Sequence, residues 1–232
     1  MNAEDLTQEY GDEYPAAAVF EGVRMPLQRE SRFLRSYESG DRGLWISRFM
    51  DGSASITAEE LKRDWPSWTH ELRMDFCNNC SWLGEQSDFA DMLRFVMHHG
   101  DSANWSGVAI SVAVHLPRDE AFGMLLRALQ VTDVGGNCAN LSQAIAHTKH
   151  PEAEAALRQH LQDVWAHPTL WDDDPFTNWV AFDARTCIQH LMELGASPAD
   201  FEGQVRKLSE HVCAGDREGC RDWLSKHYSW LK

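Results

Sequence analysis

The sequence lacks the features of a membrane-spanning or secreted chain. It has no apolar run of membrane-spanning length, and its start is acidic where a secretory signal has a basic segment followed by a hydrophobic one. Without a signal peptide, the six cysteines among 232 residues are better interpreted as reduced thiols than as a disulfide framework. We therefore expect a soluble, cytoplasmic protein that binds no membrane.

Sequence motifs of catalysis are also scarce. The chain has no glycine-rich phosphate loop and no nucleophile elbow. Its single CxxC, Cys77 and Cys80, has no second pair to complete a zinc site. His98, His99 and Asp101 are similar to the ligands of metal-dependent phosphohydrolases, but the adjacent His-Asp dipeptide of that family is absent, and histidines closing a helix explain them equally well. We expect no catalytic residue, no metal and no cofactor.

Basic residues are few. The chain holds 21 lysines and arginines against 36 aspartates and glutamates, for a formal net charge of -15. A nucleic acid is a polyanion that such a surface repels, so we expect no nucleic-acid partner. An acidic surface attracts basic proteins and speeds their association. The alternative interpretation is that the charge only keeps the protein soluble.

The sequence is rich in helical periodicity. Three units between Trp105 and Val212 each consist of a helix with small residues, a polar turn and a second amphipathic helix. The turns contain Pro117, Pro151 and Pro198, and Pro151 is predicted at the first position of its helix. One apolar stripe of the second unit is as regular as any in the chain and comprises Ala153, Ala156, Leu157, His160, Leu161 and Val164.

This arrangement resembles the HEAT-repeat class of α-solenoids, through its small-residue first helices, proline turns and leucine-rich second helices. The resemblance implies an all-α fold, a right-handed α-solenoid of antiparallel helix pairs with helical caps at both ends. The alternative is an irregular all-helical domain whose helices have similar lengths. The predicted organisation is a disordered acidic tail over 1–14 and a single domain over 15–232, divided into an N-terminal cap (15–87), HEAT-like repeats (88–212) and a C-terminal capping helix (213–232).

Three histidines, His115, His147 and His190, recur near the ends of the first helices of the three units. The repeat itself produces this spacing. We therefore interpret them as core or turn histidines satisfied by backbone groups rather than as a row of metal ligands.

An insertion between the second and third units concentrates aromatic and acidic residues that the repeat does not require. Loops on a rigid scaffold collect binding residues, and tryptophan is a frequent anchor of protein interfaces. In the alternative interpretation, the tryptophans fill the gap between units and the aspartates cap the next helix. The predicted partner-binding residues are Trp171, Asp172, Asp173, Asp174, Phe176 and Trp179.

These observations favour a non-catalytic protein-binding module that holds a basic protein, for example an immunity protein or antitoxin that covers a toxin. A general scaffold satisfies the same observations. The alternative class is a helical enzyme, either a metal-dependent hydrolase around His98, His99 and Asp101 or a HEAT-like DNA glycosylase. The sequence leaves the oligomeric state open.

Overall fold

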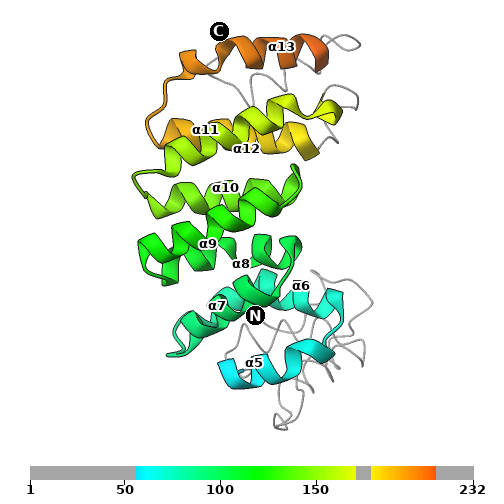
Figure 1. The fold of residues 1–232 in the computed structure, drawn as a ribbon, viewed down its shortest axis with the longest axis vertical. Helices are drawn as coiled ribbons and strands as arrows, with labels where there is room; N and C mark the ends of the chain where they lie inside the picture. The colour runs from blue at the N-terminus through cyan, green and yellow to red at the C-terminus, as the bar shows by residue number, and fades with distance from the viewer. Residues whose placement is uncertain (1–55, 171–178, 213–232) are drawn as a thin grey trace, which may run out of the picture. The chain divides into compact units, whose positions relative to one another are not determined.

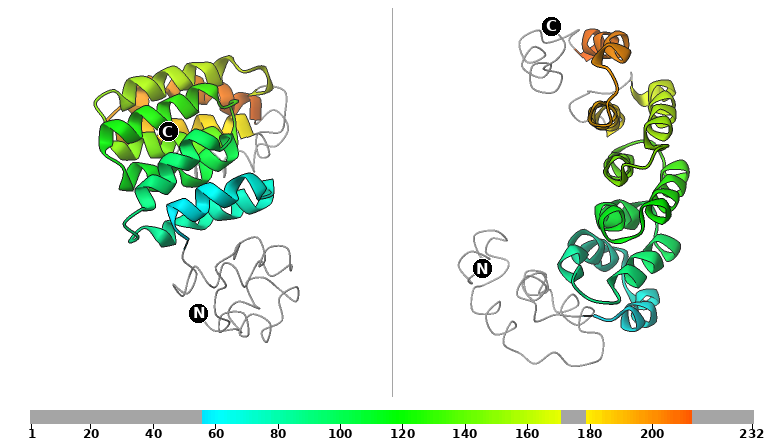
Figure 2. Two further views of the ribbon diagram at one scale, coloured as in Figure 1. Left: turned by 60° about the horizontal axis from the view of Figure 1, so that its bottom comes forward. Right: turned by 90° about the vertical axis from the view of Figure 1, so that its left-hand side faces the viewer.

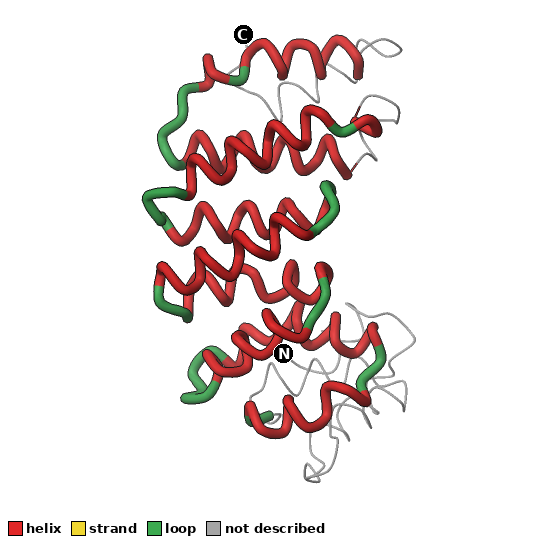
Figure 3. Tube along the Cα trace, viewed as in Figure 1, coloured by secondary structure: helices red, strands yellow, loops and turns green. Residues whose placement is uncertain are grey.

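The computed structural model describes residues 56–170 and 179–212, and all regular structure within these residues is helical. Short turns and 3-10 segments join the helices (Figure 1, Figure 3). The predicted all-α class is confirmed for this part of the chain. The α-helices are α5 (Ala58–Asp64), α6 (His70–Asn79), α7 (Phe89–His99), α8 (Ser102–His115), α9 (Arg118–Val131), α10 (Gly136–Thr148), α11 (Ala153–Ala166), α12 (Trp179–Glu193) and α13 (Glu202–Val212).

Contacts within the fold divide the chain into two compact units, Met1–Ser111 and Val112–Lys232, with the boundary inside α8. The single domain over 15–232 stays a prediction. The expected tail over 1–14 and the expected capping helix over 213–232 lie outside the described residues.

In the first unit, α5 begins with a capping box. The Thr57 hydroxyl accepts a hydrogen bond from the Glu60 backbone N–H, and the Glu60 carboxylate accepts one from the Thr57 backbone N–H. An aromatic cluster follows, in which Trp65 and Trp68 both pack against Phe76 of α6. All three rings are buried and belong to the apolar core of this unit.

In the second unit, the helices form two layers. Helices α9 and α11 lie side by side in one layer, and α10 and α12 lie in the other (Figure 2). The central residues of the predicted apolar stripes are fully buried, so we infer that the stripes face the space between the layers. These residues include Leu125, Leu141, Ile145, Leu157 and Ile188.

Two helix ends show how the local sequence acts. Gly195 takes the left-handed conformation (φ 105°) after α12, and the Ala196 N–H donates to the Leu191 carbonyl, which stops the helix. Helix α11 begins at Ala153 after Glu152 as its N-cap. The prediction of Pro151 at the first helical position is therefore wrong, because this proline lies in the preceding turn.

None of the helices in the described residues combines the length and the apolar character that a bilayer crossing requires.

Candidate functional site

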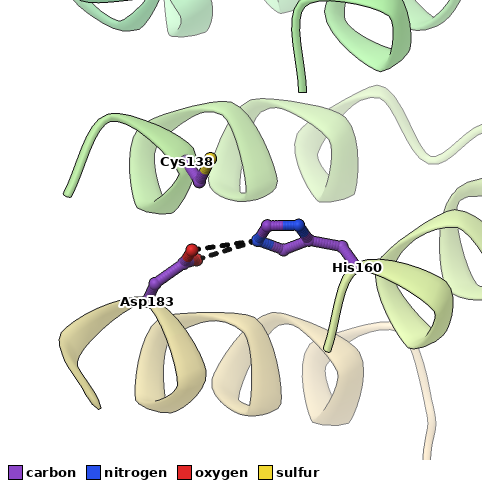
Figure 4. Close-up of side chains that lie close together, drawn as sticks. All are labelled: Cys138, His160 and Asp183. Carbon is purple, nitrogen blue, oxygen red and sulfur yellow. Dashed lines mark hydrogen bonds and ion pairs between the residues drawn. The ribbon is translucent and has the colours of Figure 1, made fainter. Parts of the chain in front are cut away.

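Three polar side chains from three different helices converge in the core of the second unit. Cys138 lies in the first turn of α10, His160 lies in α11 and Asp183 lies in α12 (Figure 4). One ligand-type atom of each residue lies within 4.8 Å of those of the other two. Cys138 and Asp183 are fully buried, and His160 is 6% exposed. Among the described residues, this is the one such group of three or more potential metal ligands.

Asp183 is the buried charge around which the group is built. His160 Nε2 lies 3.1 Å and 3.0 Å from the two carboxylate oxygens, and the Gly135 backbone N–H donates to Oδ2 at 3.2 Å. A carboxylate opposite Nε2 requires the ring proton on that nitrogen. Burying an isolated carboxylate is costly, so these contacts are needed to keep Asp183 in the core.

The local backbone explains how Gly135 reaches the carboxylate. Gly135 precedes α10 with a φ of 146°, which side-chain-bearing residues rarely adopt. This conformation turns the chain after Asp133, and the Gly135 N–H meets Asp183 of α12. The turn therefore links α10 to α12 through a charged hydrogen bond.

Cys138 is not prepared for nucleophilic chemistry in this geometry. Its thiol is directed at the Asp133 carbonyl, with Sγ 3.2 Å from the oxygen. Burial, together with the charges of Asp183 and Asp133, raises the pKa of the Cys138 thiol to about 12, against a smaller lowering by the Gly135 backbone. The thiolate is the nucleophilic form, so the thiol of Cys138 is unreactive at neutral pH.

A second buried thiol lies one helical turn beyond Asp183. The Cys187 Sγ donates to the Leu157 carbonyl of α11 at 3.3 Å. Burial, and then the neighbouring Asp183 and Cys138, raise the pKa of Cys187 well above its ordinary value. Both cysteines therefore act as neutral, packed groups between the helices.

A groove runs beside this group between α9 and α11, with a volume of about 400 Å³. Its apolar wall consists of Phe122, Leu126 and Leu129 of α9. On the α11 side, the exposed carboxylates of Glu152 and Asp163 belong to its lining. His160 also lines the groove, so one ring joins the groove wall to the buried carboxylate.

A second pocket collects histidines and glutamates at the ends of α10 and α12. His147 and His190 of the predicted histidine row line it, together with His150, Glu154 and Glu193. The His190 Nδ1 lies 2.7 Å from a Glu193 carboxylate oxygen. Burial raises the pKa of Glu193, but the hydrogen bonds from His190 and Gln189 outweigh it, and the net pKa is lowered.

The histidine row predicted from the repeat does not form one environment. His115 and His147 are exposed, whereas His190 is buried and pairs with Glu193. The expectation that backbone groups satisfy these histidines is therefore wrong for His190, because a carboxylate within reach at i+3 binds its ring more strongly.

The structure places His98 and His99 at the end of α7 and Asp101 at the start of α8. His98 and His99 are exposed in the last turn of α7, where they favour the negative end of the helix dipole. The Asp101 carboxylate accepts hydrogen bonds from the backbone N–H groups of Ala103 and Asn104, and so caps α8.

The CxxC cysteines are buried in the first unit as free thiols. The Cys80 Sγ contacts the Cys77 carbonyl at 3.5 Å. Burial raises the pKa of Cys80 to about 12 and that of Cys77 well above its ordinary value. In this environment the two thiols are neutral groups that pack in the core of the first unit.

Of the predicted partner-binding residues, Trp171, Asp172, Asp173, Asp174 and Phe176 lie outside the described residues. Trp179 is described and begins α12. The Trp179 and Phe182 rings pack edge to face with their centroids 6.0 Å apart. A Cβ added to Gly136 of α10 would lie 2.9 Å from the Trp179 Cε3. Trp179 is nevertheless 67% exposed. It therefore both packs on α10 and offers surface, and its role in binding stays a prediction.

Comparison with known proteins adds no relative to this geometry. No family model, no curated protein and no solved structure matches the chain. The function must therefore be inferred from the site itself.

His160 belongs to the apolar stripe predicted for α11, whereas Asp183 was not among the predicted site residues. The signal was present, because Asp183 stands three residues after Val180 and four before Cys187, both on the stripe of α12. A charged residue at a core position indicates a buried partner. The stripe alone does not identify that partner.

Proposed function

We propose that this chain is a non-catalytic protein-binding module, a HEAT-like right-handed α-solenoid that holds a basic protein in the groove between α9 and α11. The two-layered arrangement of α9 to α12 supports the solenoid, because alternate helices of a helix-pair repeat fall in alternate layers. In such walls, each layer presents a continuous face to a partner.

The chemistry of the groove carries the proposal. Phe122, Leu126 and Leu129 offer an apolar wall, and Glu152 and Asp163 offer carboxylates that solvent reaches. This combination fits a segment with an apolar anchor and adjacent lysines or arginines. The formal net charge of -15 attracts the same kind of partner over a longer range.

The buried group behind the groove supports recognition by a preformed surface. Contacts from Asp183 fix the His160 ring in the groove wall, and the Cys187 thiol bonds to the Leu157 carbonyl of the same helix α11. A wall that is rigid before binding loses less conformational entropy when the partner arrives. An immunity protein or antitoxin that covers a basic toxin has this chemistry, and so has a scaffold for a basic protein.

The partner is identified by photo-cross-linking in the cells that produce the protein. A photoreactive amino acid replaces Gln159, an exposed residue of the groove, and the matched control replaces Gln162, an exposed glutamine of the same helix outside the groove lining. We expect a basic protein cross-linked from Gln159 and much less from Gln162. Equal cross-linking from both positions would contradict a groove-specific contact.

The contribution of the groove is then measured with the purified partner. Glu152→Lys combined with Asp163→Lys should slow association about tenfold at low salt and flatten its salt dependence. The control combines Glu59→Lys with Glu85→Lys, which reverses two exposed charges in the first unit. If both double variants slow association equally, net charge alone attracts the partner and the groove assignment is wrong. Circular dichroism of each variant checks that folding is unchanged.

A further inference from the structure

We propose that Cys138, His160 and Asp183 form a buried binding site for a zinc ion. This inference is independent of the proposed partner, because it concerns the core between the two helix layers. It also departs from the sequence, which led us to expect no metal, since Asp183 was not recognised there as a member of the group.

The donor atoms of the three residues are those that zinc binds. A thiolate sulfur, an imidazole nitrogen and a carboxylate oxygen are the three side-chain ligands that zinc uses in proteins. Here one of each comes from α10, α11 and α12, and all three residues are buried. A mixed sulfur, nitrogen and oxygen set favours zinc over magnesium or calcium, which prefer oxygen ligands.

The donor atoms are spaced nearly as a zinc site requires. The three candidate donor atoms lie within 4.8 Å of one another. Zinc bonds of about 2.0 to 2.3 Å in a tetrahedron separate ligand atoms by roughly 3.3 to 3.8 Å. The His160 Nε2 and the nearer Asp183 oxygen, which are 3.0 Å apart, need to separate slightly, and a side-chain rotation that moves the Cys138 Sγ inward by at most about 1 Å completes the geometry. Three protein ligands leave one position of the tetrahedron for a fourth ligand.

Charge also favours a divalent cation here. The ionised forms of Cys138 and Asp183 would place two negative charges close together in the core, where burial makes uncompensated charge costly. A divalent cation neutralises both groups. On binding, the thiol releases its proton to solvent, and the single proton of the neutral His160 ring moves from Nε2 to Nδ1, which frees Nε2 to bind the ion. The carboxylate exchanges its hydrogen bond from His160 for a bond to the ion.

The position of the site gives it a structural consequence. Its ligands tie α10, α11 and α12 together, and His160 also lines the groove. Zinc bound only in the folded state stabilises that state by mass action. The metal would therefore fix one wall of the groove.

The test uses the full-length protein, reduced and freed of metal by dialysis against a chelator. Zinc is added and the bound metal is counted by elemental analysis, and cobalt(II) is added to a second sample for absorption spectroscopy. We expect one equivalent of zinc, a melting temperature raised by several degrees, and a thiolate-to-cobalt charge-transfer band in the near ultraviolet. A wild-type protein without stoichiometric uptake and without this band would overturn the proposal.

Two cysteine variants assign the band. Cys138→Ser should abolish it and weaken zinc binding by more than the 10- to 100-fold that loss of an outer-shell partner costs. Cys80→Ser removes a buried thiol of the first unit and should leave both unchanged. A band that survives Cys138→Ser but disappears in Cys80→Ser would contradict the assignment. Because the decisive spectrum is that of the wild-type protein, the test does not depend on how well a variant folds.

Discussion

Gly107 of α8 allows a close approach to α6 that an alanine would obstruct. A Cβ at this position would lie 2.8 Å from the Cys77 Cβ, 3.1 Å from the Cys77 backbone carbon and 2.8 Å from the Asn78 Oδ1. The amide of Asn78 can rotate away, but the backbone carbon and the Cβ move only with α6 itself. The substitution Gly107→Ala therefore tests how closely the two helices pack.

Two opposing effects set the size of the change. Replacing a glycine inside a helix with alanine stabilises the helix by about 1 kcal/mol. Overpacking a rigid contact costs about 1 to 3 kcal/mol, and contact with backbone atoms places Gly107 at the upper end. We expect Gly107→Ala to lower the free energy of unfolding by about 1 to 2 kcal/mol net.

Gly123 of α9 provides the matched control. It also lies inside a helix, but an added Cβ there meets nothing within 4 Å. Gly123→Ala should raise the free energy of unfolding by about 0.5 to 1 kcal/mol, because only the helix-propensity effect remains. The two substitutions are chemically identical and should differ in sign.

Equilibrium unfolding in urea measures both variants, with helical circular dichroism and tryptophan fluorescence as two probes. Coincident transitions justify the two-state analysis, and an unchanged m-value shows that the substitutions act on stability. If Gly107→Ala proves as stable as Gly123→Ala, α6 and α8 do not approach each other in the described way.

Three further predictions test the core, the thiols and one surface carboxylate. Leu157→Ala should cost about 2 to 5 kcal/mol in urea unfolding, because this side chain is fully buried, whereas Val131→Ala, at a position 69% exposed, should change little. In protein carrying Cys213→Ser and Cys220→Ser, the four buried thiols should resist a thiol reagent at neutral pH and react on unfolding. Burial is the main cause that raises the pKa of Cys80 and of Cys138 to about 12. Rapid labelling of the native protein would contradict the buried placement of these thiols. Because the pKa of Glu193 is lowered in the folded state, its ionised carboxylate stabilises the fold at pH values above the ordinary glutamate pKa of 4.5. This stabilisation is lost as the pH falls through the lower folded-state pKa. Glu193→Gln should therefore flatten the decline of the melting temperature in that acid range, by a small amount because the carboxylate is 55% exposed, and an unchanged decline would refute the pairing.

Helix positions and their buried faces follow from local patterns in the sequence. Apolar residues at the helical period mark the core positions of α9 to α12 whatever the neighbouring helix is, because the free energy gained on burial depends on apolar area and needs no particular partner. The capping box of Thr57 and Glu60 and the left-handed Gly195 are equally local, since the bonds they make span only a few residues. The all-α class predicted from this periodicity was confirmed for the described residues.

Which polar residues meet depends on how the helices pack against one another. Cys138, His160 and Asp183 stand in three helices, and His160 and Asp183 are 23 residues apart in the chain. Their convergence depends on how α10, α11 and α12 are offset and rotated against one another. The apolar stripes leave that arrangement undetermined, because several helix crossings bury the same stripe. The groove between α9 and α11 has the same origin, since its apolar wall and its carboxylates come from helices that only packing brings side by side.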